Sequence, residues 1–228
     1  IAQSVADVVL VDRFLAPRVR PRRLDISSFR IVVVENLFGA EVDADVREAC
    51  LAWVERLKAS GLRCEMRHVP VFEEVRAAFA RHGTLVAAEA GHVLAGYAEH
   101  PLRHHIDPRI LQRLLAARKM LASDMLALQQ IRRSLMHALV ETEPPTAYLF
   151  PTTPTPAPPL EPLLTLEGFQ AANNQALRHT MLGSFLDMPG FALPCGFVRK
   201  GLPASVLLSM PSGCDAALLA LASHLESM

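Results

Sequence analysis

The sequence has no excess of charge and few cysteines. Its 23 basic and 23 acidic side chains cancel at neutral pH. This balance favours neither a nucleic acid nor an anionic membrane as a partner. The cysteines, at positions 50, 64, 195 and 214, form no CxxC motif and no paired framework. We therefore expect reduced thiols in a cytoplasmic protein.

Long hydrophobic runs and a metal-ligand pattern are also absent. The apolar opening segment, residues 1–16, is interrupted by Asp7, Asp12 and Arg13, so it is too short and too charged to span a bilayer or serve as a signal sequence. The histidines show no HExxH or paired-ligand spacing. We predict no membrane span, metal site or cofactor. Because the first residue is Ile1 rather than methionine, a fragment is the simplest expectation.

What the sequence does contain is enough apolar material for a sizeable core, since 51% of the 228 residues are hydrophobic. Two apolar runs, 190–193 and 204–208, flank the polar segment 197–201, which predicts two strands joined by an exposed loop. Neither run alternates strictly, so we expect helices over both faces of a central sheet. Another strand is predicted at 147–150, ending at the prolines of 151–159, which lack amide donors.

A strand–helix–strand unit is predicted near the start of the chain. Residues 30–34 form a β-branched run, Asp43 or Asp45 caps a helix to about residue 59, and a second strand follows at 62–69. Further helices are expected at 4–15 with a wide buried stripe, 71–96 with a break at Gly83, 109–120, 123–140, 165–182 and 216–225. On the helix 123–140, Arg132 and Arg133 are expected to face solvent.

Several segments, in order, resemble the C-terminal half of amidase-signature hydrolases. They are IAQSVADVVLVDRFLA, RIVVVENLFGAEVDADVREACLAWVERLKASGLRCEMR, LFPTTPTPAPP, LDMPGFALPCG and KGLPASVLL. The resemblance covers nearly the whole chain. It implies an α/β fold with a mixed central sheet covered by helices, in which residues 1–228 are the C-terminal portion of a single domain.

The resemblance also implies hydrolysis of a small-molecule amide by two serines and a lysine in a glycine- and serine-rich stretch. That stretch is missing here. The lysines are Lys58, Lys119 and Lys200, and the adjacent pair Ser27–Ser28 has no flanking glycines. A serine needs a base and an oxyanion site to act as a nucleophile. We therefore expect no catalytic residue in this chain, an upstream Ser-Ser-Lys group, and no activity from the chain alone.

Four pocket candidates follow from the resemblance: Thr152, Arg178, Asp187 and Cys195. Arg178 either faces the substrate or, as its fixed donor geometry favours, ties its helix to a carboxylate such as Asp187. Cys195 follows a strand end, where ligands gather in α/β folds. It is interpreted as a small buried thiol rather than a catalytic cysteine, because no local pattern places a histidine beside it.

Two other classes of function stay open at this stage. The chain is alternatively a non-catalytic binding or assembly module, with an apolar surface where a catalytic half would otherwise pack. It is alternatively a transamidation subunit that delivers ammonia within a complex. The expected partner of the chain is the missing N-terminal portion or a second copy in a homodimer.

Overall fold

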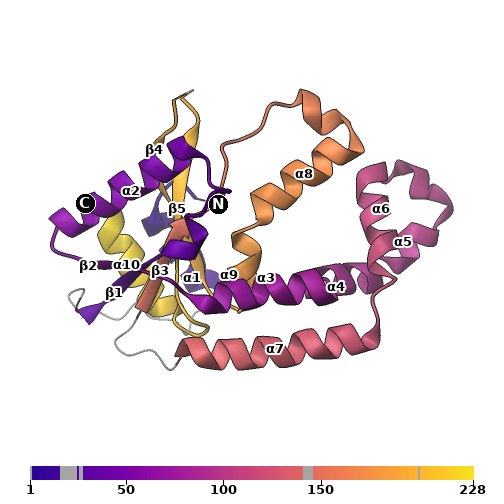
Figure 1. Cartoon of the computed structure of the whole chain (residues 1–228), viewed down its shortest axis with the longest axis horizontal. Coiled ribbons are helices and arrows are strands. Elements are labelled where there is room, and N and C mark those ends of the chain that lie inside the picture. The colour runs from indigo at the N-terminus through magenta and orange to yellow at the C-terminus, as the bar shows by residue number, and fades with distance from the viewer. Residues whose placement is uncertain (1, 16–24, 26–27, 141–145, 200) are drawn as a thin grey trace.

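A five-stranded sheet forms the centre of the computed structural model, which describes residues 2–15, 25, 28–140, 146–199 and 201–228 (Figure 1). The strands are β1 (Arg30–Val34), β2 (Arg63–Arg67), β3 (Thr146–Pro151), β4 (Gly190–Phe197) and β5 (Pro203–Ser209). Their order is β2-β1-β3-β5-β4. β1 is parallel to β2 and β3, and β5 is antiparallel to β3 and β4. The predicted α/β fold with a mixed sheet is confirmed.

The predicted strand–helix–strand unit is β1, α2 (Ala44–Ala59) and β2. Asp43, rather than Asp45, is the residue that caps α2, because its carboxylate accepts hydrogen bonds from the amides of Asp45 and Val46. The chain then turns at Gly61 and returns as β2 beside β1. The local signals in the sequence were therefore sufficient for this unit.

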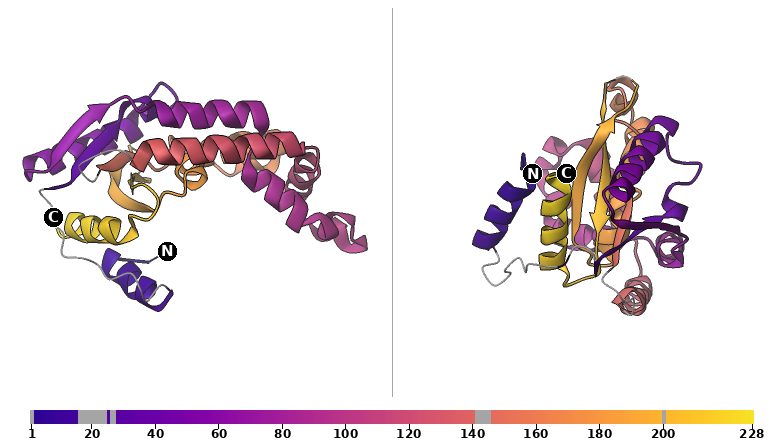
Figure 2. Two further views of the ribbon diagram at one scale, coloured as in Figure 1. Left: turned by 90° about the horizontal axis from the view of Figure 1, so that it is seen from below. Right: turned by 90° about the vertical axis from the view of Figure 1, so that its left-hand side faces the viewer.

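The remaining helices are α1 (Val5–Leu15), α3 (Pro70–His82), α4 (Leu85–Val93), α5 (Ala95–Glu99), α6 (Pro108–Ala117), α7 (Ala122–Val140), α8 (Leu166–Leu177), α9 (Thr180–Phe185) and α10 (Asp215–Glu226), with 3-10 turns η2 (Glu35–Leu37), η3 (Pro101–His105) and η4 (Glu161–Leu164). α2 covers one face of the sheet and α10 the other, with α1 outside α10 (Figure 2). α3, α4 and α7 run away from the sheet toward α5 and α6. Across the described ranges, no helix is both long and apolar enough to cross a membrane.

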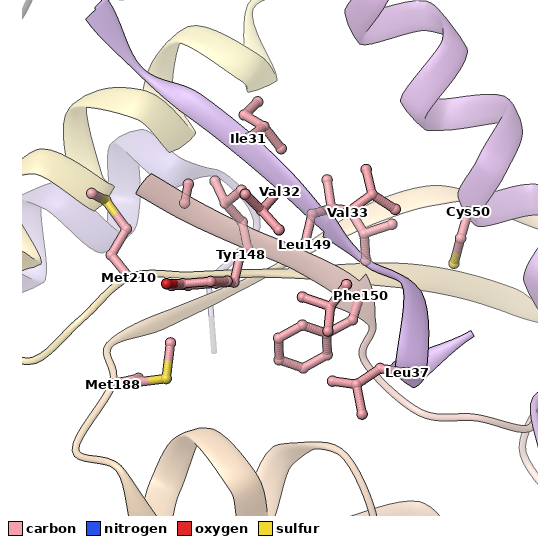
Figure 3. Packing of buried hydrophobic residues seen from close by; sticks show 14 of the residues in the cluster. Ile31, Val32, Val33, Leu37, Cys50, Tyr148, Leu149, Phe150, Met188 and Met210 are labelled. Atoms are coloured by element: carbon pink, nitrogen blue, oxygen red, sulfur yellow. The ribbon is translucent and has the colours of Figure 1, made fainter. Parts of the chain in front are cut away.

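The core lies where β1 and β3 meet the covering helices (Figure 3). The Phe72 ring of α3 meets Tyr148 and Phe150 of β3 edge to face, with centroids 5.9 and 5.6 Å apart. These three aromatic side chains are buried. Their packing holds α3 against the carboxyl-terminal half of β3, where the polar residues described below gather.

Two predictions about burial were wrong. On α1, which packs against α10, only Val5 is buried, and Phe14 and Leu15 are 80% and 81% exposed. β4 is an edge strand whose residues 190, 192, 194 and 196 are exposed. Helices therefore cover that face of β4 only in part, although β1 and β3 are buried on both faces.

Candidate functional site

A group of polar side chains lies beyond the carboxyl ends of β1 and β3. Glu41 comes from the segment between η2 and α2, Arg76 from α3, and Arg178 and His179 from the junction of α8 and α9. Thr152 directly follows β3. Ligands of α/β folds gather at this end of the strands, which makes the group the candidate site.

Two guanidinium groups share one carboxylate in this group. Arg76 Nη1 lies 3.2 Å from Glu41 Oε1, and Arg178 Nε lies 3.8 Å from the same oxygen. Burial alone raises the pKa of Glu41, but a backbone hydrogen bond and the two arginines outweigh it and hold that pKa below its usual value. Glu41 is therefore ionised at neutral pH, and these three side chains together carry one excess positive charge.

His179 is fully buried behind this charged group. Its Nδ1 lies 2.7 Å from the carbonyl oxygen of Pro151. Because a carbonyl oxygen can only accept, Nδ1 carries the proton and donates the hydrogen bond. Burial lowers the pKa of His179 to about 4, against the opposing effect of the Pro151 hydrogen bond. At neutral pH the imidazole is uncharged, and its Nε2 is an acceptor.

Several buried polar atoms of the group make no hydrogen bond within the described ranges. They are His179 Nε2, Thr152 Oγ1, and Nε and Nη2 of Arg76. Buried polar groups in folded proteins usually have partners. These atoms include both hydrogen-bond donors and an acceptor. A ligand or another protein segment that bound here could form hydrogen bonds with them.

The structure brings Arg178 and Thr152 to this site but separates the other two candidates from it. Arg178 approaches a carboxylate, as one of its two interpretations held, but that carboxylate is Glu41 and not the suggested Asp187. Asp187 lies 3.6 Å from Arg132 Nη2 and accepts a hydrogen bond of 2.7 Å from Ser212 Oγ. The expectation that Arg132 faces solvent was wrong, because its Nε donates to the Phe185 carbonyl at 2.6 Å.

Asp187 therefore stabilises a turn in this chain and does not lie in the candidate site. Its φ of 57° places it in the left-handed region, which aspartate tolerates better than most residues. The contacts with Arg132 and Ser212 join this turn to α7 and to the segment before α10. The turn sets the direction in which the chain leaves α9 for β4.

Cys195 is a buried thiol, as predicted, and lies 3.8 Å from Cys50 measured between sulfur atoms. All four cysteines are free thiols. Over the part of the chain that the structure describes, no three histidine, cysteine or acidic side chains form a group that could hold a metal ion. Ser27 and Lys200, which were not expected to be catalytic, lie outside the described residues.

Sequence reasoning missed Glu41, Arg76 and His179 as members of the site. Arg76 and His179 lie on helical segments that were predicted and Glu41 lies in a connecting segment, but no short motif links the three residues. Their meeting depends on the placement of α3 and α8 around the end of β3. Arg178 and Thr152 were the members that the sequence signalled, through their places ahead of the LDMPG segment and in the LFPTTP segment.

Comparison with known proteins identifies the wider group to which the chain belongs. A family model described as Amidase matches residues 6–219. The chain belongs to the amidase family. It is 26% identical to 2-amino-5-chloromuconic acid deaminase of Comamonas testosteroni, over 91% of this chain and 45% of that protein. It is 27% identical to mandelamide hydrolase of Pseudomonas putida, over 100% of this chain and 49% of that protein.

A solved structure agrees with this membership of the amidase family. A crystal structure of an amidase superimposes with a TM-score of 0.77 at 25% sequence identity, covering 99% of this chain and 51% of the other. The chain thus spans about half the length of the relatives it matches. The resemblance to the C-terminal half of amidase-signature hydrolases is confirmed.

Proposed function

We propose that this chain is the C-terminal portion of an enzyme that hydrolyses small carboxylic amides. The observation that carries the proposal is the amidase family match along residues 6–219 of a chain about half as long as its relatives. In this proposal two serines and a lysine upstream of Ile1 perform the chemistry. A serine activated by a base attacks the amide carbonyl, and an acyl-enzyme is then hydrolysed.

The contribution of this chain is one wall of the substrate pocket. Arg178 is the proposed substrate-contacting residue, because its side chain is 44% exposed and approaches Glu41 no closer than 3.8 Å. A guanidinium binds a carboxylate or an amide oxygen in a fixed direction. The Comamonas relative is named for an acid, and a carboxylate on the substrate would balance the excess positive charge of the site. Thr152 lies in the same wall.

The proposal includes a cytoplasmic location, in keeping with the free cysteines. It needs no cofactor, since serine-based amide hydrolysis is complete without one. The chain by itself is proposed to be inactive, because its three lysines are not accompanied by a glycine- and serine-rich stretch.

The test compares the 228-residue chain with a longer product of its reading frame. Ammonia release from mandelamide and from other small amides is measured for both. We expect turnover by the longer protein only, and amide turnover by the purified 228-residue chain would refute the proposal.

Arg178→Lys in the longer protein tests the role of the wall. We expect KM for a carboxylate-bearing amide to rise by about tenfold, with a smaller change for a neutral amide. Arg199→Lys is the matched control, since Arg199 lies between β4 and β5, is 80% exposed and forms an ion pair with Asp45 of α2. Equal effects of Arg178→Lys on charged and neutral substrates would remove Arg178 from substrate recognition.

A second candidate, a binding or assembly module, is supported by the exposed apolar surfaces. These are the outer stripe of α1, the open face of β4, and a mostly apolar hollow of about 470 Å³ between α4, α6 and α9.

Sedimentation of the purified chain distinguishes the two candidate functions. Half of an enzyme should dimerise or aggregate, whereas a binding module should be monodisperse. Copurification with other subunits would instead favour a transamidation complex.

A further inference from the structure

Two cysteines far apart in the sequence lie in contact in the core. Cys50, on α2, is 0% exposed and Cys195, on β4, is 5% exposed. Their sulfur atoms are 3.8 Å apart, about van der Waals contact. The Cys50 side chain points from α2 toward the strands (Figure 3). Neither thiol has a role in the function proposed above.

The local fold of β4 explains why Cys195 reaches α2. Pairing with β5 passes from Pro194 opposite Ser205 to Gly196 opposite Ala204, so Cys195 is the extra residue of a β-bulge. Gly196 accepts the φ of 140° that follows the bulge. The Cys195 carbonyl accepts a hydrogen bond of 3.3 Å from Arg56 of α2. The bulge therefore joins β4 to α2 through both the backbone and the side chain of one residue.

We propose that Cys50 and Cys195 are an oxidative modification site, at which a peroxide converts the two thiols into a reversible disulfide between α2 and β4. The sulfur atoms must approach from 3.8 Å to about 2.05 Å in the bond. A displacement of this size is within the reach of a side-chain rotation or a small shift of an edge strand. β4 is such a strand, since it pairs only with β5 within the described sheet.

Cys195 is the thiol that reacts first. Its hydrogen bond with Cys50 lowers its pKa, assisted by the Arg56 cation and opposed by burial. The same hydrogen bond and burial raise the pKa of Cys50. Since the thiolate is the nucleophile, the more acidic and slightly exposed Cys195 attacks the oxidant, and Cys50 is the resolving thiol.

The reaction has two balanced steps. The Cys195 thiolate attacks one oxygen of hydrogen peroxide, so an S–O bond forms, the O–O bond breaks, and hydroxide leaves. Cys50 then attacks the resulting sulfenic sulfur, so an S–S bond forms and the oxygen leaves as a second hydroxide. The two thiol protons convert both hydroxides to water. A dithiol reverses the modification by two exchanges.

The first test uses the unaltered reduced chain. It is treated with hydrogen peroxide, quenched by alkylation under denaturing conditions, and digested without reductant. We expect a cross-linked peptide pair containing Cys50 and Cys195, with Cys64 and Cys214 alkylated. Because the bond closes a loop of 145 residues, the melting temperature should rise by roughly 10 °C and return on adding dithiothreitol.

Variants then separate this bond from other oxidation. Cys50→Ala and Cys195→Ala should each abolish the dithiothreitol-reversible rise, whereas Cys64→Ser and Cys214→Ser should keep it. The proposal would be overturned if Cys50 and Cys195 were both still reduced after peroxide treatment and were therefore both recovered in alkylated form. A sulfinic acid at Cys195 without a cross-link, or a cross-link that involves Cys64 or Cys214, would also overturn it. The peptide map needs no variant, so it decides the question even where a substitution prevents folding.

Discussion

Acidification should destabilise this protein through one buried imidazole, that of His179. The pKa of His179 falls from 6.5 to about 4 on folding, mainly because the ring is desolvated. A group whose pKa is depressed in the folded state binds a proton more readily when the chain is unfolded. For this histidine, stability is fully present above pH 6.5 and is lost as the pH falls from 6.5 to 4.

The size of this loss follows from the two pKa values. At pH 5 the unfolded histidine is almost wholly protonated and the folded one almost wholly neutral. The free energy of unfolding should therefore be about 2 kcal/mol lower at pH 5 than at pH 7.5 on account of His179. The full loss, reached below pH 4, is about 3 kcal/mol.

The assay is urea unfolding, followed by tryptophan fluorescence, at intervals between pH 7.5 and pH 5. His179→Gln should flatten the profile, because it removes the group that titrates differently in the two states. His104→Gln is the matched control: His104 also places Nδ1 near a proline carbonyl, at 3.1 Å from Pro101, but it is exposed. Parallel profiles for the wild type and His179→Gln would refute the assignment of the pH dependence to His179.

Two further substitutions test the packing and the local signals. Phe150→Ala removes a fully buried ring that packs edge to face on Phe72 and should lower the free energy of unfolding by about 3–5 kcal/mol; Phe197→Ala, at an exposed ring, should change it by less than about 0.5 kcal/mol. A similar loss for both in urea titrations would contradict this placement of the core. Asp43→Ala removes the cap of α2 and should cost about 1 kcal/mol, whereas Glu48→Ala on the exposed side of the same helix should not destabilise the protein. Equal midpoints for the two variants would show that the cap does not stabilise α2.

The sequence by itself determined the elements that depend on neighbouring residues. The β-branched run of β1, the Asp43 cap of α2 and the break at Gly83 each act within one turn or strand, so their signals are local. The hairpin of β4 and β5 was also predictable, since two apolar runs flank a short polar segment. The ordered segments shared with amidase-signature hydrolases then indicated the fold as a whole.

Only the tertiary structure decided which side chains meet and which apolar faces stay exposed. For Arg178 the sequence left open a substrate contact or a carboxylate such as Asp187, nine positions away. In the structure Arg178 approaches Glu41, which is far from it in the sequence. Cys50 and Cys195 are 145 residues apart and meet because a bulge in an edge strand turns toward α2. The apolar stripe of α1 was expected to be buried, but most of it is exposed. Burial depends on what packs against a helix, which the pattern of the helix itself does not show. Contacts between distant residues are set by the packing of whole elements, which residue spacing within one element does not encode.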